Sequence, residues 1–503
     1  MDLMTAEQLE AMVKKESLFA PSDEASDIIL GLRCCNQTAE SVEKYKRIVT
    51  LAMQVRSYME SGKGKRKKWP AILLENLQNY VSSQMAENQQ TVPKLIHFVW
   101  IGGPIPQVVM QYIKVWAKIN PDYVITIWYD SNLLGLKKLS DLLKTTVGGD
   151  ELRKTDRKVW ADAVFRIRQD FTDYVLKHNP EFQKMSETMK AFSVSLGKEE
   201  DFGTEPVWEE DISSSNINLL DIHGELAPDE EMYRIYMLEA IQTQNFAALS
   251  DMVRLFVLKR FGGVYLDTDM LPEIEPSLMT GFREVEESTR QRLFLQAIME
   301  ATGEIPGYST EFLESYGRKA EIRDIVAGKA LVTLMAPLGD IQCNPMGFRI
   351  FYRNKSVINQ MLACCRNSMA VDMLLALIKQ NYGIMDKYFE KPPFLGRSLN
   401  NVIDVRADAV REITNRELQE MLRRVCTYYA TGIVPEVKCT IDLTGPTIYA
   451  CIMYGILFLE NDFYKGIFGW SYQYQGYKSF FIPSDKLTYE TEEEMKSSWQ
   501  AEK

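Results

Sequence analysis

The chain has 503 residues and a formal net charge of −11, which argues against a protein that binds nucleic acid mainly through charge. Hydrophobic residues make up 46% of it, as expected for a globular rather than a disordered protein. No apolar run is long enough for a transmembrane helix, and "MDLMTAEQLEAMVKK" lacks the apolar core of a secretory signal peptide. The eight cysteines and three histidines show no metal-binding spacing, so we expect reduced, mostly buried thiols.

Residues 1–92 have the pattern of a helical bundle, which we treat as a separate N-terminal domain. The stretch "TAEQLEAM" places Thr5 and Gln8 at the spacing of a capping box, before apolar residues at helical intervals. A basic run at 63–68, followed by Trp69, interrupts the pattern. In an acidic protein this run is either a solvated loop or a contact for anionic lipid.

From residue 93 to 503 the pattern is that of a second, larger α/β domain. "KLIHFVWIGG" and "YVITIWYDSN" read as buried strands, and the helical stretch "VVMQYIKVWAKIN" between them completes a βαβ unit. Ligands bind at the carboxyl ends of strands in such sheets. Residues 140–235 are mostly charged and helical, and "DISSSNINLLD" is predicted to be a polar loop.

The densest signal is "NFAALSDMVRLFVLKRFGGVYLDTDMLP", which predicts a helix, a Gly-Gly stop and a short strand. Asp251 and Arg254 are three residues apart and therefore share one side of the helix. Strand alternation would place Asp267 and Asp269 on one face. A hard divalent cation suits such carboxylates and takes its other ligands from phosphate oxygens. The pattern thus indicates a metal–diphosphate site, as in a nucleotide-sugar transferase.

Each of these residues also has a plain structural interpretation. An isolated Asp-x-Asp is more often a solvated turn, and Asp251 with Arg254 could be a structural ion pair. Trp100 could be a core residue at a strand end, and the C-terminal segment a frayed tail.

Several motifs in order resemble the catalytic domain of the large clostridial glucosylating cytotoxins, a retaining glycosyltransferase family with the GT-A fold. They are "IHFVWIGG", "YDSN", "SDMVRLFVLKRFGGVYLDTDMLP", "KSVINQ", "TIDLTGP" and "TEEEMKSSW", which together span roughly residues 93–499. The resemblance implies a GT-A, Rossmann-like nucleotide-sugar-binding core with large helical insertions.

The resemblance also implies a set of site residues. It assigns the uracil ring to Trp100, the sugar to Asp251, Arg254 and Asn359, and the ribose and sugar region to Tyr265 and Asp267. It makes Asp269 a direct ligand of the metal, typically Mn²⁺ with Mg²⁺ as the alternative, and completes the metal shell with Glu494 and Ser497. Trp499 would reach the glycosidic oxygen and β-phosphate, from a tail that closes as a lid.

The same resemblance extends to substrates and location. Ile358 and Gln360 flank Asn359, and this bulky pair favours UDP-glucose over UDP-N-acetylglucosamine as donor. The expected acceptor is a hydroxyl, a threonine by analogy, of a host small GTPase of Rho or Ras type. We expect secretion without an N-terminal signal peptide and action in the host cytosol, at the inner plasma membrane if the N-terminal bundle binds anionic lipid. Asp442 departs from the Asn expected in its motif.

Two other functions compete with this one. A transferase that uses another UDP-sugar, or a polysaccharide or lipid acceptor, would share the core and differ in the acceptor. A non-catalytic scaffold on a decayed transferase fold would lack the metal and sugar residues, which are complete here.

Overall fold

The structure is a computed structural model that describes most of the chain. The described residues are 2–16, 22–39, 67–87, 90–203, 216–226, 228–305, 316–343, 347–353, 356–388, 444–446, 481–483 and 488–490, with single positions between 44 and 59 and at 440, 448 and 449.

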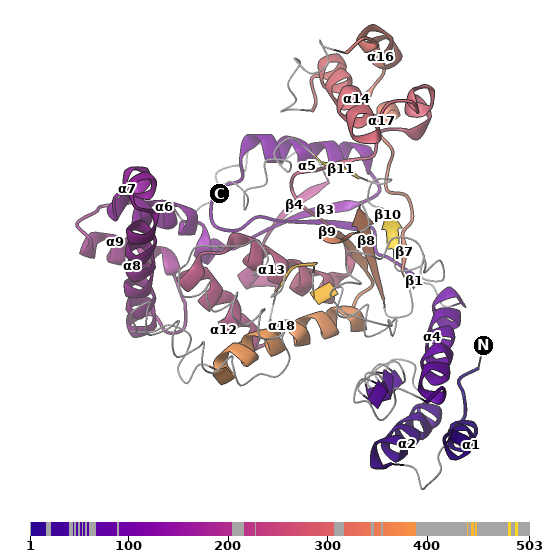
Figure 1. The fold of residues 1–503 in the computed structure, drawn as a ribbon. Coiled ribbons are helices and arrows are strands. Elements are labelled where there is room, and N and C mark those ends of the chain that lie inside the picture. The colour runs from indigo at the N-terminus through magenta and orange to yellow at the C-terminus, as the bar shows by residue number, and fades with distance from the viewer. Residues whose placement is uncertain are drawn as a thin grey trace.

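In this part of the chain a seven-stranded sheet, ordered β10-β8-β9-β5-β2-β3-β4, lies at the centre of the molecule (Figure 1). Strands β5, β2, β3 and β4 run parallel, β9 joins β5 and β8 antiparallel, and β10 runs parallel to β8. The bounds are β2 (Leu95–Val99), β3 (Val124–Tyr129), β4 (Ile217–Asp221), β5 (Gly263–Leu266), β8 (Phe348–Arg353), β9 (Ser356–Cys364) and β10 (Phe481–Pro483).

Two short antiparallel pairs lie beside this sheet. Strand β1 (Gln90–Thr91) pairs with β7 (Gln342–Cys343). Strand β6 (Met270–Pro272) pairs with β11 (Thr488–Glu490), so a late segment of the chain returns to the residues directly after Asp269.

The predicted βαβ unit is confirmed. Strand β2 is connected to the parallel strand β3 by α5 (Gln107–Ile119), and all but the first residue of β2 is buried. One face of α5, with Ile113 and Trp116, packs against strand residues such as Ile96 in a single apolar cluster. A near-continuous apolar strand buried on both faces is typical of parallel sheets.

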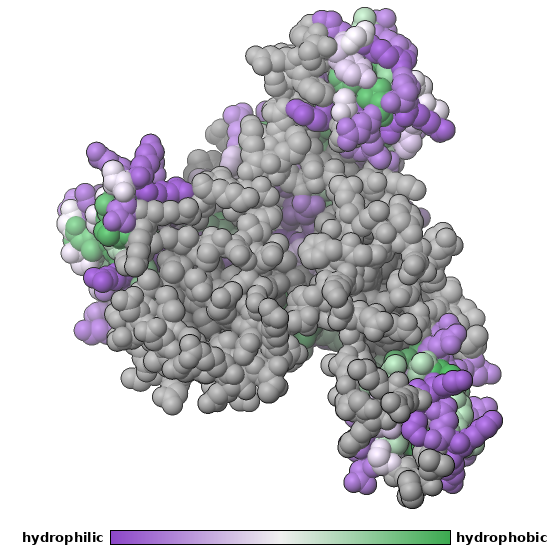
Figure 2. Space-filling model, in the orientation of Figure 1, coloured by the Kyte–Doolittle hydropathy of each residue, from purple (hydrophilic) through white to green (hydrophobic). Residues whose placement is uncertain are grey.

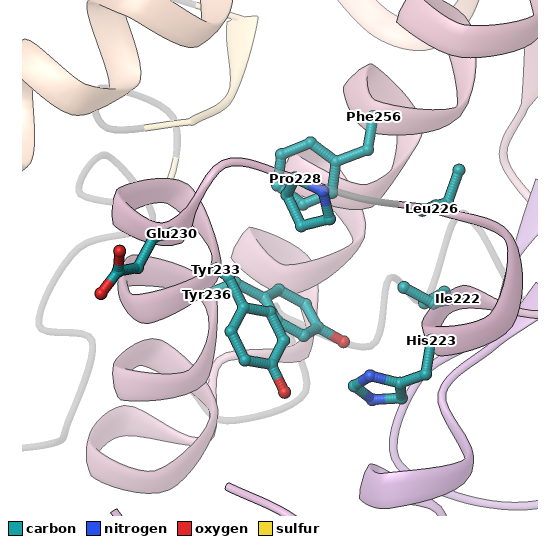
Figure 3. A pocket seen from close by; sticks show the side chains of 8 residues that line it. All are labelled: Ile222, His223, Leu226, Pro228, Glu230, Tyr233, Tyr236 and Phe256. Atoms are coloured by element: carbon teal, nitrogen blue, oxygen red, sulfur yellow. The ribbon is translucent and has the colours of Figure 1, made fainter. Parts of the chain in front are cut away.

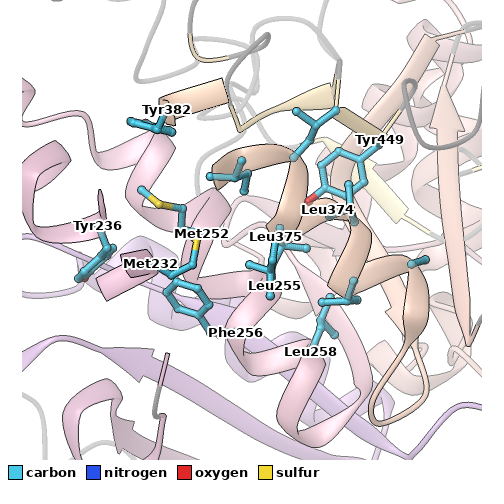
Figure 4. Packing of buried hydrophobic residues seen from close by; sticks show 14 of the residues in the cluster. Met232, Tyr236, Met252, Leu255, Phe256, Leu258, Leu374, Leu375, Tyr382 and Tyr449 are labelled. Carbon is cyan, nitrogen blue, oxygen red and sulfur yellow. The ribbon is translucent and has the colours of Figure 1, made fainter. Parts of the chain in front are cut away.

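Helix α13 (Phe246–Phe261) lies on the face of the sheet opposite α5, beside α12 (Glu230–Leu238) and α18 (Met369–Tyr388) (Figures 1 and 4). The helix and its stop at Gly262 and Gly263 were predicted from the sequence, and both are confirmed. Unlike an ordinary surface helix, it is buried nearly all round, from Ala248 and Leu249 and then continuously from Asp251 to Leu258. Its polar side therefore faces other protein groups rather than water.

Helices project from this core in three places (Figure 1). On the face shown in Figure 2, the coloured surface of these projections is mostly hydrophilic, with smaller hydrophobic patches. The N-terminal one holds α1 (Ala6–Glu16), α2 (Asp23–Gln37) and α4 (Trp69–Glu87). The second holds α6 (Leu136–Thr146), α7 (Gly149–Thr155), α8 (Arg157–His178) and α9 (Met185–Ser195), and the third α14 (Glu287–Thr302), α16 (Lys319–Val326) and α17 (Leu331–Leu334). Shorter elements are η1 (Ser131–Leu133), α11 (Ile222–Glu225), η2 (Glu239–Thr243) and η3 (Pro276–Phe282).

The N-terminal helices match the sequence in one detail and differ in another. Thr5 N donates to Gln8 Oε1 at 2.9 Å and Gln8 N to Thr5 Oγ1 at 3.2 Å, so the capping box is confirmed. Trp69, however, is only 1% exposed and packs on Tyr58, so it belongs to the core and offers no lipid contact. The division of the chain at residues 92 and 93 stays a prediction.

One loop prediction was wrong in its second half, and its first residues, 211–215, lie outside the described part of the chain. Residues 217–221, the second half of "DISSSNINLLD", form β4 and pair in parallel with β3 from Ile125 to Tyr129. Ile217, Leu219 and Leu220 of β4 are apolar, but the mainly polar run at 211–216 before them dominated the composition of this stretch and hid the strand. No helix within the described ranges is both long enough and apolar enough to span a membrane.

Candidate active site

Two glycines set the direction in which the chain leaves α13. Gly262 has φ +65° and Gly263 φ +97°, backbone conformations that L side chains rarely adopt. A Cβ on Gly263 would lie 2.8 Å from the Leu95 carbonyl oxygen and 3.0 Å from His97 Nε2. The helix can therefore turn directly into β5 beside β2 only because both residues lack a side chain.

His97 stabilises this turn through a hydrogen bond to its backbone. Trp128 Nε1 donates to His97 Nδ1 at 3.2 Å, which leaves the proton on Nε2, and Nε2 donates to the Gly262 carbonyl oxygen at 2.9 Å. Burial lowers the pKa of His97 to about 4. The imidazole is thus neutral and structural.

The segment after β5 differs from the prediction. Strand β5 ends at Leu266, and Asp269 lies in a turn before β6 begins at Met270. The alternation of side chains along a strand therefore does not govern Asp267 and Asp269, and the reasoning that put them on one face was wrong. Both follow the carboxyl end of a parallel strand, as expected for a ligand site in this fold class.

Arg254 is the centre of the site. Its Nη2 lies 3.0 Å from Asp251 Oδ1 and 3.4 Å from Asp267 Oδ1, and Nη1 donates to the Asn359 carbonyl oxygen at 2.5 Å. Its guanidinium carbon lies 4.2 Å from the centre of the Tyr265 ring. One buried cation therefore joins the helix, β5 and β9.

Asp251 is 4% exposed and accepts three hydrogen-bond donors. Asn359 Nδ2 donates to Oδ1 at 2.7 Å, Arg254 approaches the same oxygen, and Thr444 Oγ1 donates to Oδ2 at 2.9 Å. Burial raises the pKa of Asp251 to about 7, although Arg254 and the hydrogen bonds oppose the rise. The carboxyl group is thus held near its titration point at neutral pH.

The antiparallel pairing of β5 with β9 brings Asn359 into the cluster. Tyr265 lies opposite Leu362, and Asp267 N donates to the Gln360 carbonyl oxygen at 2.8 Å. Tyr265 Oη donates to Asp267 Oδ1 at 2.5 Å. The Asp267 side chain remains 26% exposed, whereas those of Asp251 and Arg254 are 5% exposed, so Asp267 forms the open edge of the cluster.

The remaining predicted residues lie around this cluster or outside the described part. Trp100 follows β2, next to β5, and its backbone N donates to the Trp128 carbonyl oxygen at 2.9 Å. Asp269 is half-buried in its turn. Glu494, Ser497, Trp499 and the proposed lid lie outside the described residues, as do Asp442 and the Ile358 side chain.

The described part of the chain holds no group of three or more His, Cys, Asp or Glu side chains arranged to bind a metal. Asp269 nevertheless supplies a carboxylate in a turn at the strand ends, and oxygen ligands of this kind suit a hard cation. The donor chemistry therefore fits Mn²⁺ or Mg²⁺ if further ligands come from elsewhere.

Sequence reasoning missed two contributors from residues 440–449. Thr444 bonds to Asp251, and Tyr449 is fully buried with its ring stacked on Phe348. The motif "TIDLTGP" marked this segment as one to examine, but it gave Thr444 no role. A hydrogen bond between residues 193 positions apart has no signal in local sequence patterns.

A second polar network, around the Asp130 of "YDSN", joins the end of β3 to α11 and α12. Its buried carboxylate bonds to His223 Nε2 at 2.8 Å and accepts from Tyr236 Oη at 2.8 Å. Burial lowers the pKa of His223, but the bond to Asp130 and the charges of Asp130 and Asp221 outweigh it, so the pKa is raised. Beside this network a cavity of about 340 Å³ is lined by Ile222, His223, Leu226, Pro228, Glu230, Tyr233, Tyr236 and Phe256 (Figure 3).

Comparison with known proteins agrees with this geometry. The TcdA/TcdB catalytic glycosyltransferase domain family matches residues 94–192 and 205–443. Cytotoxin-L of Paraclostridium sordellii is 27% identical over 99% of this chain, and Toxin B of Clostridioides difficile 26% identical over 99%. The chain spans only 22% of the length of either relative.

Solved structures show the same fold. The catalytic domain of alpha-toxin from Clostridium novyi superimposes with a TM-score of 0.75 at 20% identity, over 99% of this chain and 97% of that one. The UDP-bound glycosyltransferase domain from the YGT toxin gives 0.54 at 21% identity, over 81% and 82%. The predicted fold, a nucleotide-sugar-binding α/β core with helical insertions, is confirmed. The chain belongs to the TcdA/TcdB catalytic glycosyltransferase domain family and is a glycosyltransferase domain.

Proposed function

We propose that this domain transfers glucose from UDP-glucose, with retention of configuration, to a hydroxyl group of a host small GTPase. The observation that carries the proposal is the buried cluster of Asp251, Arg254, Asp267 and Asn359 at the carboxyl end of β5. Buried carboxylates with raised pKa values and an open edge are a common feature of functional sites.

The cluster suits a sugar better than an apolar ligand. A hexose presents several hydroxyl groups, each both donor and acceptor, and carboxylate, amide and guanidinium groups pair with both kinds. Asp267, whose side chain is 26% exposed at the open edge, would contact the sugar and ribose. A negative charge there would also favour positive charge developing at the anomeric carbon. Trp100, at the end of the neighbouring strand, offers an aromatic face for uracil.

The C-terminal segment supports the proposed metal shell. Strand β11 ends at Glu490, opposite Met270, the residue after Asp269. The chain from Glu490 to Glu494 spans at most about 14 Å, so Glu494 can reach the same edge of the site. Asp269, Glu494 and Ser497 would hold Mn²⁺, with Mg²⁺ as the alternative. When bound, this cation supplies positive charge for the departing diphosphate.

The remaining roles belong to the tail. The Trp499 indole N–H would donate to the glycosidic oxygen or β-phosphate, where negative charge grows as the bond breaks. A segment that closes over the donor would exclude water and so favour transfer over hydrolysis.

Labelling of a host-cell lysate tests the acceptor. The protein is incubated with radiolabelled UDP-glucose, Mn²⁺ and lysate, and protein, lipid and polysaccharide fractions are separated. Label on a band of small-GTPase size, at a threonine by peptide mapping, is the expected result. Label confined to lipid or polysaccharide would instead support the alternative acceptor class, and no transfer to any fraction would reject the proposal.

Donor choice is tested separately. Gln360 lies on β9 directly after Asn359, and with Ile358 it would occupy the space that an N-acetyl group needs. We expect kcat/KM to favour UDP-glucose over UDP-N-acetylglucosamine. A preference of about tenfold or more for the acetylated donor, about 1.4 kcal/mol, would contradict this inference.

We also propose that the basic run at 63–68 attracts the N-terminal helices to anionic membrane, at about 1 kcal/mol per basic residue near the surface. Flotation with liposomes containing phosphatidylserine should recover the protein, and neutral liposomes should not. Equal recovery from both would leave the run a solvated loop.

A further inference from the structure

Two residues from the C-terminal part of the chain, Thr440 and Thr444, are hydrogen-bonded to α13 and its N-terminal cap. Thr444 Oγ1 donates to Asp251 Oδ2 at 2.9 Å, and Asn245 Nδ2 donates to Thr440 Oγ1 at 2.9 Å. Asn245 is the N-terminal cap of α13, because its side chain accepts from Ala248 N. Thr444 is 0% exposed, so its bond to Asp251 is shielded from water. Thr440 and Thr444 therefore both lie against the N-terminal half of α13, which carries Asp251.

The hydrogen bonds of Asp251 leave one place for a ligand. An ionised carboxylate has about four acceptor positions. Oδ1 faces both Asn359 Nδ2 and Arg254 Nη2, and among the described residues Oδ2 accepts only from Thr444. The one remaining acceptor position is therefore on Oδ2, on the oxygen that Thr444 holds.

The groups around Asp251 determine how much the hydrogen bond from Thr444 contributes to keeping the carboxyl group ionised. Arg254 from α13, Asp267 and Tyr265 from the β5 edge and Tyr449 from the C-terminal segment are the titratable groups around Asp251. Burial and Asp267 favour the neutral acid, while Arg254, Thr444 and Asn359 favour the carboxylate. The Tyr449 hydroxyl has no hydrogen-bond partner in the described part of the chain and therefore does not stabilise the carboxylate.

We propose that Thr444 is a positioning residue of the transfer reaction, which orients Oδ2 of Asp251 toward a donor-sugar hydroxyl and keeps Asp251 ionised. The sugar-binding role of Asp251 rests on the proposed function, whereas the bond between Thr444 and Asp251 does not. Loss of the hydroxyl removes a donor to the charged form, so Asp251 would hold its proton to higher pH.

The test compares Thr444→Val, which keeps the shape and removes the hydroxyl, with Thr444→Ser, which restores it. UDP-glucose hydrolysis is measured from about pH 5.5 to about pH 9 with one divalent cation throughout. We expect the acid limb of kcat/KM to move up by about one pH unit in the valine variant, which is an approximately tenfold loss on the acid side of the profile. The serine variant should retain the wild-type profile within about twofold.

A matched control removes another buried threonine hydroxyl. Thr172 is 1% exposed and donates to the Arg168 carbonyl oxygen in α8, away from the cluster. Thr172→Val should leave the pH profile of hydrolysis unchanged. A Thr444→Val profile that superimposes on that of the wild type, or a pH-independent loss that serine does not rescue, would overturn the proposal.

Measurements of unfolding test the role of Thr444 independently of the proposed function, because they require no enzymatic activity. If the wild type hydrolyses no UDP-sugar, the proposed function fails, but the bond can still be tested. At each pH we compare the unfolding equilibrium constant of Thr444→Val with that of the wild type. The ratio of the two constants should be about tenfold higher near pH 9 than near pH 6. In the Asp251→Asn background the same substitution should show no such pH dependence. An equal effect of pH in both backgrounds would show that Thr444 does not act through Asp251.

Discussion

Replacement of Asp251 by asparagine should stabilise the free protein while it impairs function. Asp251 is buried, and its pKa is raised from 3.8 to about 7. The folded state therefore retains a proton that the unfolded chain has lost, and stability falls as pH rises from about 4 to about 7. A shift of about three units at about 1.4 kcal/mol per unit gives an upper bound of about 4 kcal/mol, fully present above about pH 7.

Asparagine has nearly the same shape and does not titrate. Between about pH 5 and about pH 8 we expect the stability of Asp251→Asn relative to the wild type to increase by about 3 kcal/mol, since the unfolded wild type is already ionised at the lower pH. Denaturant unfolding followed by circular dichroism at several pH values measures this difference. The same variant should lose on the order of a hundredfold in UDP-glucose hydrolysis, because a charged hydrogen-bond acceptor is lost.

The control is Asp150→Asn, which makes the same chemical change at a side chain that is 84% exposed. Its stability should follow the wild type across the pH range. Parallel stability curves for Asp251→Asn and the wild type would refute the reasoning, because they would show that the buried carboxyl group does not titrate near neutral pH in the folded protein.

Three further predictions concern the turn, the second polar network and the tail. Gly263→Ala should destabilise the protein by about 3 kcal/mol or more in denaturant unfolding, because the Cβ of the new alanine would lie 2.8 Å from a backbone atom. The control Gly281→Ala should change stability by less than about 1 kcal/mol in the same assay, because no atom lies within 4 Å of a Cβ at that position. The pKa of His223 is raised, so its ion pair with Asp130 stabilises the fold at low pH, and this stability is lost as pH rises through that pKa. His223→Gln should therefore be more destabilising near pH 6 than near pH 8.5. An equal loss of stability at both pH values would contradict the assignment. Deletion of residues 490–503 should abolish hydrolysis and leave the melting temperature nearly unchanged, so a fully active truncation would exclude the lid.

The sequence alone revealed those parts of the site that depend on local rules. The helix before β5 follows from its apolar spacing, and Gly262 with Gly263 marks its end because few other residues adopt a positive φ. Asp251 and Arg254 could be placed together because residues three apart on a helix are neighbours. These features need no knowledge of distant parts of the chain.

The parts that the sequence did not reveal depend on contacts between distant segments. Asn359, which the resemblance but no local rule had assigned to the site, reaches Asp251 because β9 pairs with β5, and Thr444 bonds to Asp251 from 193 positions further along the chain. Strand alternation was used to place Asp269 on the same face as Asp267, and it fails because the strand ends at Leu266. Strand β4 was missed because a mainly polar run directly before it made the whole stretch look like a loop.

The central claim is that the carboxylates after β5 form a donor site that works with a bound cation. Its most direct test is hydrolysis of UDP-glucose by the purified protein, with and without Mn²⁺, for the wild type, Asp267→Asn, Asp269→Asn and the exposed control Asp150→Asn. We predict hydrolysis that requires the metal, falls by about a hundredfold or more in Asp267→Asn and Asp269→Asn, and is unchanged in the control. Hydrolysis that is indifferent to Mn²⁺, or that survives both substitutions after β5, would contradict the account.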